Sequence, residues 1–469
     1  MAEDKFSIGL KLTDLNDFIN PSQTCVSMVK TTSSDSNAPR EDQKRAKIEL
    51  TDGGEYVEVN SDGKEKALED ARISLNDCLA CSGCITSAES VLITSQSVDK
   101  LLDAFKSSTL PPVVVSFSPQ SLASLGSHFG EKDTNLLFSR LVTFCKTHLH
   151  AVDVIDTATA LDASVIAVAK EFVEHYKSTM SAPKPSPLIV SECPGWVCYA
   201  EKTHPEALPC MSHVRSAMAL VGASIKSKRP DSFHVSVMPC YDKKLEASRD
   251  DFYDADAKRH DVDLVLATSE LIDLFERLNV KYSEIPAAPE LPPLYWNSQK
   301  GSITSVAGGY LENVLRIAAK EIFGIDDLSA PGVHFKSAQM RNADMREYVL
   351  RVDGRKEYFK FAAAYGFRNI QNVVRKIKMG TCAYHFVEVM ACPRACINGG
   401  GQVKPPKDVT GEEWVKKVKE TLDERAFRFP EENKEAQELV AEAEKGGFLM
   451  TQFHDRQDAK PANPLQLQW

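Results

Sequence analysis

Residues 388–402 read EVMACPRACINGGGQ, and two cysteines of this stretch, Cys392 and Cys396, stand four residues apart. That spacing fits a turn, or the first turn of a helix, which directs both sulfur atoms to the same side. The three glycines at 399–401 would let the backbone pass close to a bound group and offer N–H groups to it. The stretch therefore indicates a site where thiolates hold a metal group against the main chain.

Two further cysteines have similar surroundings. Residues 191–196 read SECPGW, and residues 238–246 read MPCYDKKLE. In both segments, as in 388–402, the cysteine follows a short apolar run that predicts a strand. The carboxyl ends of parallel strands are the usual place for ligands in open α/β sheets. Four thiolates, as many as a 4Fe-4S cubane needs, would then come from these strand ends: Cys193, Cys240, Cys392 and Cys396.

An α/β core surrounds these cysteines in the predicted organisation, because short β-branched runs alternate with amphipathic patterns from about residue 110 onward. The expected strands are 113–116, 152–155, 188–190, 234–237, 264–267 and 385–389, and the expected helices are 161–176, 269–278, 311–323 and 369–378.

Outside the core the sequence is more polar. A small hairpin is expected over 48–59, and charged surface helices over 412–424 and 431–444. We expect four regions: an N-terminal iron–sulfur region with a polar linker (1–105), the α/β core (106–405), a helical extension (406–453) and a disordered tail (454–469).

A second metal site is predicted near the N-terminus, where residues 78–84 read CLACSGC. This spacing lets a short loop wrap three corners of one cubane, and bacterial ferredoxins add a fourth cysteine at the position that Ala88 occupies here. Cys25 is the other cysteine of this region. Zinc is the alternative metal. Zinc sites usually combine one C-x2-C pair with histidines or with a second C-x2-C pair, and no histidine precedes His128. The predicted ligands of a 4Fe-4S cluster are Cys25, Cys78, Cys81 and Cys84.

Composition sets further limits. The 469 residues carry a net charge of -10, which argues against a nucleic-acid-binding surface as the main activity but leaves room for a local basic patch. No apolar stretch approaches the roughly 18 residues of a membrane-spanning helix, and a secretory signal is not recognisable. We expect a cytoplasmic protein, with the nucleus as a second location, whose 12 cysteines bind metal and do not form disulfides.

The three core segments resemble, in the same order, the three signature motifs of iron-only (FeFe) hydrogenases. Together with residues 78–84, they make the chain similar to the eukaryotic hydrogenase-like proteins of cytosolic iron–sulfur assembly, the Nar-type or nuclear prelamin A recognition factor-like proteins. The resemblance implies a two-lobed core of parallel sheets flanked by helices, with two 4Fe-4S clusters. It also implies a factor that links an upstream cluster scaffold to the late targeting complex, without hydrogenase activity.

One departure from hydrogenases concerns the proton relay. Hydrogenases carry a cysteine where this chain has Glu192, and glutamate can also move protons, so an active hydrogenase or another redox enzyme stays open as an alternative. Lys243 and Glu246 match residues around the hydrogenase site, but a surface helix pair is equally open. Met238 and Met390 either pack over the cluster or simply fill space in the apolar core. A third alternative is an interaction protein whose clusters only hold the fold together.

The remaining predictions concern the chain end and the isolated cysteines. The resemblance implies that Trp469 docks on the targeting complex, which includes a WD40-repeat adaptor; an inert end is the alternative. We expect no membrane partner and no direct nucleic-acid partner. Trp196 is expected in the core, and four cysteines are expected to be buried small hydrophobes: Cys145, Cys198, Cys210 and Cys382.

Overall fold

The computed structural model describes residues 47–50, 56–59, 65–67, 92–106, 111–179, 186–289, 291, 295–296, 304–340 and 342–456. The predicted N-terminal ligands and the chain end lie outside these residues: Cys25, Cys78, Cys81, Cys84 and Trp469. Within the described part, no helix is long and apolar enough to cross a membrane.

The first of two large sheets has four strands in the order β10-β7-β4-β5, and every neighbouring pair is parallel. All five residues of β4 are buried, as expected for a parallel sheet covered by helices on both faces. The strands are β4 (Val113–Phe117), β5 (Ala151–Asp156), β7 (Phe233–Met238) and β10 (Leu264–Ala267). The nearby helices are α2 (Val98–Lys106), α3 (Pro119–Phe129), α4 (Thr134–His148), α7 (Ala217–Lys228), α8 (Asp242–Ala247) and α9 (Thr268–Arg277).

The second large sheet has five strands in the order β12-β13-β14-β15-β6. Its β14, β15 and β6 are parallel, whereas β12, β13 and β14 are antiparallel and joined by short connections that permit only this pairing. This antiparallel part was not among the strands predicted from the sequence. The strands are β6 (Leu188–Val190), β12 (Val333–Gln339), β13 (Met345–Val352), β14 (Tyr358–Tyr365) and β15 (Phe386–Met390).

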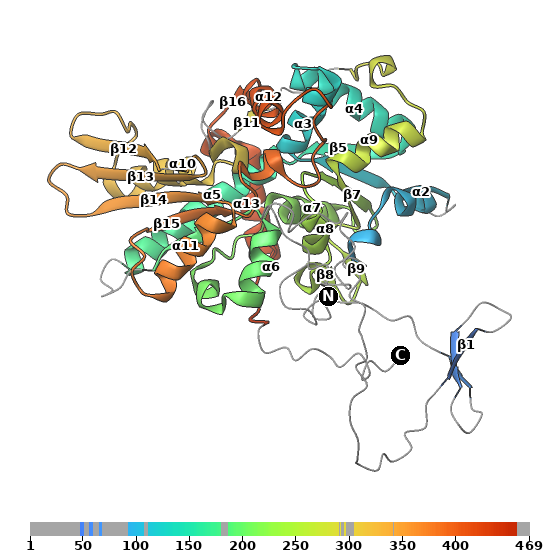
Figure 1. Cartoon of the computed structure of the whole chain (residues 1–469), viewed down its shortest axis with the longest axis horizontal. Helices are drawn as coiled ribbons and strands as arrows, with labels where there is room; N and C mark the ends of the chain where they lie inside the picture. Colours follow the sequence, from blue (N-terminus) through green and yellow to red (C-terminus); the bar gives the residue numbers. More distant parts are fainter. Residues whose placement is uncertain are drawn as a thin grey trace, which may run out of the picture.

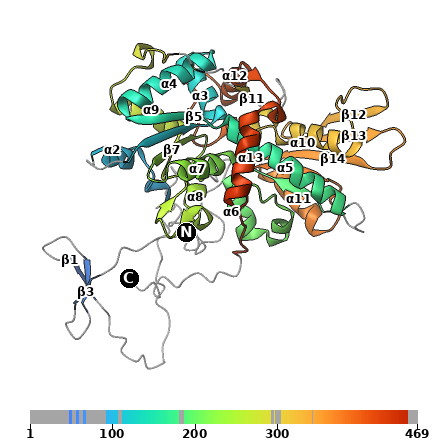
Figure 2. The ribbon, with the colours of Figure 1, turned by 180° about the vertical axis from the view of Figure 1, so that it is seen from behind.

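Helices near the middle of the molecule join the two sheets, as Figures 1 and 2 show. In α5 (Ala158–Thr179), Phe172 packs edge-on against Phe359, Phe361 and Phe386 of the second sheet. The same helix contacts α7 beside the first sheet, so that one contiguous apolar core spans both sheets. Around it lie α6 (Pro194–Thr203), α10 (Tyr310–Ala318, followed by a π-helical turn, Ala319–Phe323) and α11 (Phe367–Lys378).

The helical extension packs on this core. In α12 (Gly411–Asp423), Trp414, Val418 and Leu422 are buried, and the helix contacts α3, while α13 (Lys434–Gly446) lies against α5. Their charged residues form the solvent face of amphipathic helices, as predicted. Thr410 and Glu413 form a capping box that begins α12.

The predicted α/β fold is confirmed, and its six core strands and four core helices are found with ends within three residues of the expected ones. The predicted hairpin is the antiparallel pair β1 (Lys47–Leu50) and β2 (Tyr56–Val59), to which β3 (Glu65–Ala67) adds a third strand. The limits of the four predicted regions stay predictions.

Candidate metal centre

Four of the predicted ligand cysteines lie at the carboxyl ends of strands from both sheets. Cys193 follows β6 and forms the N-cap of α6, whose first residue, Pro194, needs no hydrogen-bond acceptor. Cys240 follows β7, Cys392 follows β15, and Cys396 lies in the 3-10 turn Ala395–Asn398. The parallel strands thus bring together residues that are about 200 positions apart in the sequence.

The four thiols face one another. Burial raises the pKa of Cys240 well above its usual value, and Asp242 and the thiols of Cys193, Cys396 and Cys392 raise it further. Burial likewise raises the pKa of Cys193, Cys392 and Cys396. Four thiols crowded in a water-poor space resist ionisation, and a cationic group that binds them would remove this penalty.

Backbone N–H groups are directed at two of the sulfur atoms. Cys193 accepts hydrogen bonds from the N–H groups of Ala391 and Trp196, and Cys392 accepts one from Gly400; these bonds act against the rise in pKa. The loop of Cys193 is also tied to the neighbouring strand, because the Ser191 hydroxyl donates to the Val389 carbonyl over 2.5 Å. N–H donors of this kind favour thiolates and tune a bound cluster.

Two glycines permit a close approach between the loops. A Cβ atom on Gly399 would lie 2.3 Å from the carbonyl oxygen of Pro239, and one on Gly401 would lie 3.0 Å from Cys240 Cα and 2.8 Å from Ala267 Cβ. The N–H of Gly401 donates to that same Pro239 oxygen over 3.0 Å. The loop after Cys396 is therefore hydrogen-bonded to and packed against the first sheet. Larger residues in place of Gly399 or Gly401 would push the two halves of the site apart.

The turn between Cys392 and Cys396 has an uncommon backbone. Arg394 and Ala395 have φ values of 62° and 56°, in the left-handed region that residues other than glycine seldom adopt. The side chain of Asp344 accepts a hydrogen bond from the N–H of Arg394 over 2.8 Å and so supports the turn. Strained backbone held by its surroundings is common at functional sites, and here it sets the direction of both cysteines.

The donor set fits a 4Fe-4S cluster. Among the described residues no three histidine, cysteine or acidic side chains are close enough to hold a single metal ion. In a cubane, each thiolate binds its own iron, so the sulfur atoms stand farther apart than around one ion. Such a group is suited by four thiols, of which Cys193 and Cys240 are buried and Cys392 and Cys396 partly buried. N–H groups aimed at sulfur and glycines where the main chain passes closest fit it as well.

A buried chain of polar side chains borders Cys396. The Nζ atom of Lys243 lies 2.7 Å from a carboxylate oxygen of Glu246 and 3.6 Å from one of Glu192. Burial opposes the charge of Lys243, yet Glu246 and Glu192 raise its pKa above the usual value. The Lys243 and Glu246 side chains are only 4% and 10% exposed, so the alternative of a surface pair is wrong.

Two members of this polar region were not singled out from the sequence. The Tyr310 hydroxyl donates to Glu192 over 2.7 Å, and its oxygen lies 2.8 Å from the Ser164 hydroxyl. Glu388 lies in the middle of β15, fully buried, and burial raises its pKa well above the usual value. A lone acid in the apolar run 386–390 was a visible signal for Glu388, whereas no local motif marks Tyr310.

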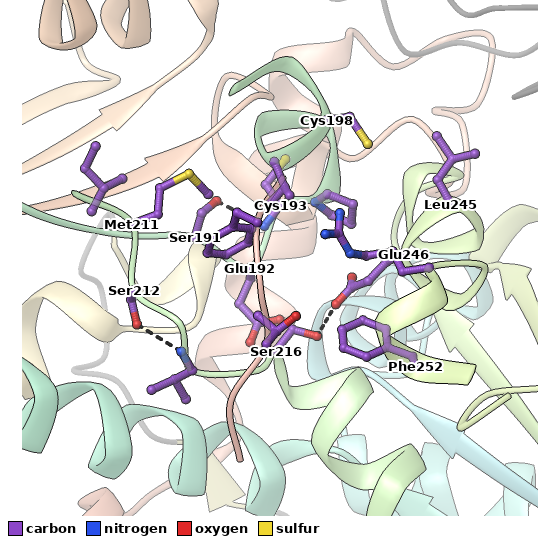
Figure 3. A pocket seen from close by; sticks show the side chains of 17 residues that line it. Ser191, Glu192, Cys193, Cys198, Met211, Ser212, Ser216, Leu245, Glu246 and Phe252 are labelled. Carbon is purple, nitrogen blue, oxygen red and sulfur yellow. Dashed lines mark hydrogen bonds between the residues drawn. The ribbon is translucent and has the colours of Figure 1, made fainter. Parts of the chain in front are cut away.

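Two small cavities reach the cysteines. One, of about 20 Å³, is lined by Glu192, Lys243, Met238 and Cys396, and it is about large enough for one water molecule. The other, of about 40 Å³, reaches Cys193 and is bordered by Glu192, Glu246 and Ser216 (Figure 3). Glu192, Lys243 and Met238 therefore lie on the same side of the site as Cys396.

The C-terminal segment 449–456 covers one side of the second cavity. The Thr451 N–H donates to the His213 carbonyl over 2.7 Å. Farther along the segment, the His454 N–H donates to a carboxylate oxygen of Glu201 over 3.0 Å. Glu201 also makes a two-pronged, buried contact with Arg249, with N–O distances of 2.8 and 3.2 Å. This buried ion pair anchors the end of the described chain beside the site.

The other predictions for single residues have mixed outcomes. Trp196 is fully buried, as predicted, and Met238 and Met390 are buried as well. Cys145 and Cys210 are buried, but Cys198 and Cys382 are partly exposed, so the prediction of burial is wrong for these two. Cys198 lies in the middle of α6 and lines the cavity that reaches Cys193, and Cys382 lies in the loop after α11; local sequence revealed neither position.

Comparison with known proteins gives consistent results. The family described as the C-terminal domain of the iron-only hydrogenase large subunit matches residues 111–400. The Mus musculus protein "Cytosolic iron-sulfur assembly component 3" is 42% identical, covering 99% of each chain. "Protein NAR1" of Arabidopsis thaliana is 39% identical, covering 96% of this chain and 97% of its own.

A solved structure supports the fold. An apo form of FeFe hydrogenase HydA1 from Chlamydomonas reinhardtii has a TM-score of 0.63 and 22% sequence identity, covering 77% of this chain and 99% of that chain. At this level of identity the likeness concerns the fold alone.

Proposed function

Because the chain belongs to the iron-only hydrogenase-like family that includes the cytosolic iron–sulfur assembly component 3 proteins, we propose that it acts in the assembly of cytosolic and nuclear iron–sulfur proteins. The printed names of full-length relatives support this role. The structural observation that carries the proposal is the meeting of four cysteines at strand ends of both sheets.

One 4Fe-4S cluster would be held by Cys193, Cys240, Cys392 and Cys396. The N–H groups of Ala391, Trp196 and Gly400 would stabilise the negative charge of the thiolates. When bound, the cluster supplies a redox-active iron centre. The ligand residues themselves would tie the loop after β7 to the loops after β6 and β15, and thereby hold the two sheets together.

A second 4Fe-4S cluster would be held by Cys25, Cys78, Cys81 and Cys84. This part of the proposal depends on the C-x2-C-x2-C spacing and on the resemblance to the assembly factors. The residues lie outside the described part of the chain.

An enzyme of the hydrogenase type is the second candidate function. The contact of Lys243 with Glu246 and Glu192 beside Cys396 favours it, because such a chain of groups can carry protons. Against it stands the glutamate at position 192, where hydrogenases carry the cysteine of the proton relay. The names of the full-length relatives also indicate an assembly factor.

The partners would be an upstream cluster scaffold and the late targeting complex with its WD40-repeat adaptor, in the cytoplasm and also in the nucleus. Trp469 would provide an apolar anchor beside the terminal carboxylate. Deleting Trp469 and measuring retention of the targeting complex tests this contact. Unchanged retention contradicts it.

The first test is the iron, sulfide and zinc content of the full chain after anaerobic purification and reconstitution. We expect about eight iron and eight sulfide ions per chain without zinc. About ten iron ions, with hydrogen uptake or evolution, would favour the hydrogenase; stoichiometric zinc would contradict the N-terminal cluster.

A second test addresses assembly itself. In cells depleted of their own copy, the wild-type chain should restore the activity of a cytosolic iron–sulfur enzyme, and a variant without the four core cysteines should not. Restoration by that variant would contradict a role for this cluster site in assembly.

A further inference from the structure

The antiparallel part of the second sheet forms a wing, defined here as β12, β13 and β14, that reaches beyond the helices at one end of the molecule (Figures 1 and 2). Its outermost strand, β12, pairs with β13 on one side and stands at the end of the strand order. Six of its seven residues are exposed. An exposed edge strand is a template for pairing with another chain.

The register of β12 shows which backbone groups are available. The Met340 N–H donates to the Met345 carbonyl, and the Asp353 N–H donates to the Gly332 carbonyl. In an antiparallel pair these hydrogen-bonded positions alternate, so the even-numbered residues of β12 bond to β13. The N–H and C=O groups of Phe335, Ser337 and Gln339 therefore point away from β13, toward solvent.

One face of the wing is basic. Lys336 lies opposite Val349, which lies opposite Lys360, and the Arg351 guanidinium stacks over the Tyr358 ring at 4.3 Å. The helix α11 continues this face: it has four basic residues and no acidic one. The basic face is defined here by Lys336, Arg351, Lys360, Arg375 and Lys376.

The charge of this face is only partly balanced. Lys360 lies 3.6 Å from Glu347, and Lys360 and Lys376 flank the ring of Tyr384 at 5.0 and 5.2 Å. No ion pair with another described residue is found for Lys336, Arg375 or the stacked guanidinium of Arg351. On a chain with a net charge of -10, such a patch is a local exception that an anionic partner can recognise.

The opposite face of β12 is apolar where it meets the core. Phe335 is 37% exposed, and its ring stacks on the buried ring of Tyr348 with centroids 5.7 Å apart. A strand added next to β12 would place alternate side chains on the two faces. One set would lie beside Lys336, on the side of the sheet that carries the basic face, and the other would lie beside Phe335.

We propose that the β12 edge and the basic face form a docking site for an extended segment of a partner protein in which acidic and apolar residues alternate. The segment would add a strand to the sheet, bond to the backbone of Phe335, Ser337 and Gln339, and direct its acidic side chains to Lys336, while Arg351 and Lys360 on the inner strands attract it at longer range. This proposal is independent of the cluster sites, because the wing contributes none of the four core cysteines.

The chemistry of the site disfavours two other occupants. A second copy pairing edge to edge would bring lysines of β12 close together, which is repulsive. A single-stranded nucleic acid needs free aromatic faces for stacking, whereas Arg351 and the two lysines already cover Tyr358 and Tyr384.

The test uses the full chain and a fluorescent peptide of alternating glutamate and valine, with binding measured by anisotropy. We expect the wild type to bind this peptide at least about tenfold more tightly than a lysine–valine peptide of equal length, with weaker binding at high salt. Reversing two charges in Lys336→Glu/Arg351→Glu should weaken binding roughly tenfold. The matched control is Lys416→Glu on α12, which should bind as the wild type does.

A second variant tests the strand addition separately from charge. Ser337→Pro removes one outward N–H at an edge position where proline is tolerated, and should weaken binding, while Ser337→Ala keeps the N–H and should not. Far-UV circular dichroism checks that each variant is folded. Equal binding of the acidic and basic peptides, unchanged binding by the charge-reversed variant, or tighter binding of single-stranded RNA to the same face would each overturn the proposal.

Discussion

The cysteine site and the wing differ in whether their charged and polar side chains are buried or exposed to solvent. At the cysteine site, two of the thiols accept hydrogen bonds from backbone N–H groups, and the buried Lys243 is met by the carboxylates of Glu246 and Glu192. On the wing and on the neighbouring helix α11, the exposed side chains of Arg351 and Lys376 lie over tyrosine rings. Buried polar groups cost stability unless they are paired, whereas exposed ones leave binding capacity for a partner.

The largest expected effect is the loss of a cluster ligand. Cys396→Ala should lower the iron content by about four ions per chain and destabilise the contact between the two sheets, because cluster binding and folding are coupled. Iron analysis and thermal unfolding of anaerobically prepared protein measure both effects. Cys382→Ala is the matched control, since that thiol is partly exposed and outside the site. Normal iron content in Cys396→Ala would remove this residue from the ligand set.

A pair of ion-pair deletions compares the two regions directly. Glu201→Ala leaves the guanidinium of Arg249 buried beside the site and should lower the free energy of unfolding by about 3 kcal/mol. Asp353→Ala removes an exposed contact to His334 on the wing. This variant should change the free energy of unfolding by less than about 0.5 kcal/mol. Chemical denaturation measures both. Similar losses in the two variants would contradict the contrast drawn between the regions.

The variant Gly401→Ala tests the close packing of the loop after Cys396 against Cys240 and Ala267. The added Cβ would lie 2.8 Å from Ala267 Cβ and 3.0 Å from Cys240 Cα, and such overpacking costs about 1–3 kcal/mol. Gly411→Ala, where nothing lies within 4 Å of the added atom, is the control and should be close to neutral. If Gly401→Ala unfolds like the wild type and keeps its iron, the two loops are less closely packed than described.

The last expected effect concerns pH and is spread over several pH units. Burial raises the pKa of Asp162, on α5, to about 7 against the opposing effects of Asn433 and Arg428. Between pH 4 and 7 the folded state therefore holds a proton that the unfolded state has lost, so stability should fall as pH rises, by up to about 1.4 kcal/mol per pH unit. Asp162→Asn should remove this part of the slope, as measured by unfolding at several pH values. An unchanged slope would mean that Asp162 is charged in the fold.

Several features could be predicted from the sequence because their signals are local. The cysteine motifs at 191–196, 238–246 and 388–402 carry their spacing and turn residues with them, and the core strands are continuous apolar runs. The wing was missed because β12 is almost wholly exposed and β13 mixes buried and charged residues, so that no apolar run marks these two strands; β14 alone has an apolar run, at 361–365. Their pairing depends on neighbouring strands more than on intrinsic preference.

What the sequence alone determined is the chemistry: thiolates for iron, glycines for close passage, and strands that end at the cysteines. Only the tertiary structure decided that Lys243 and Glu246 are buried next to Cys396, and that Tyr310 reaches Glu192. The tertiary structure likewise assembled the basic face from β12, β13, β14 and α11. These contacts join distant segments, and their energies depend on burial and geometry that arise only when the sheets pack together.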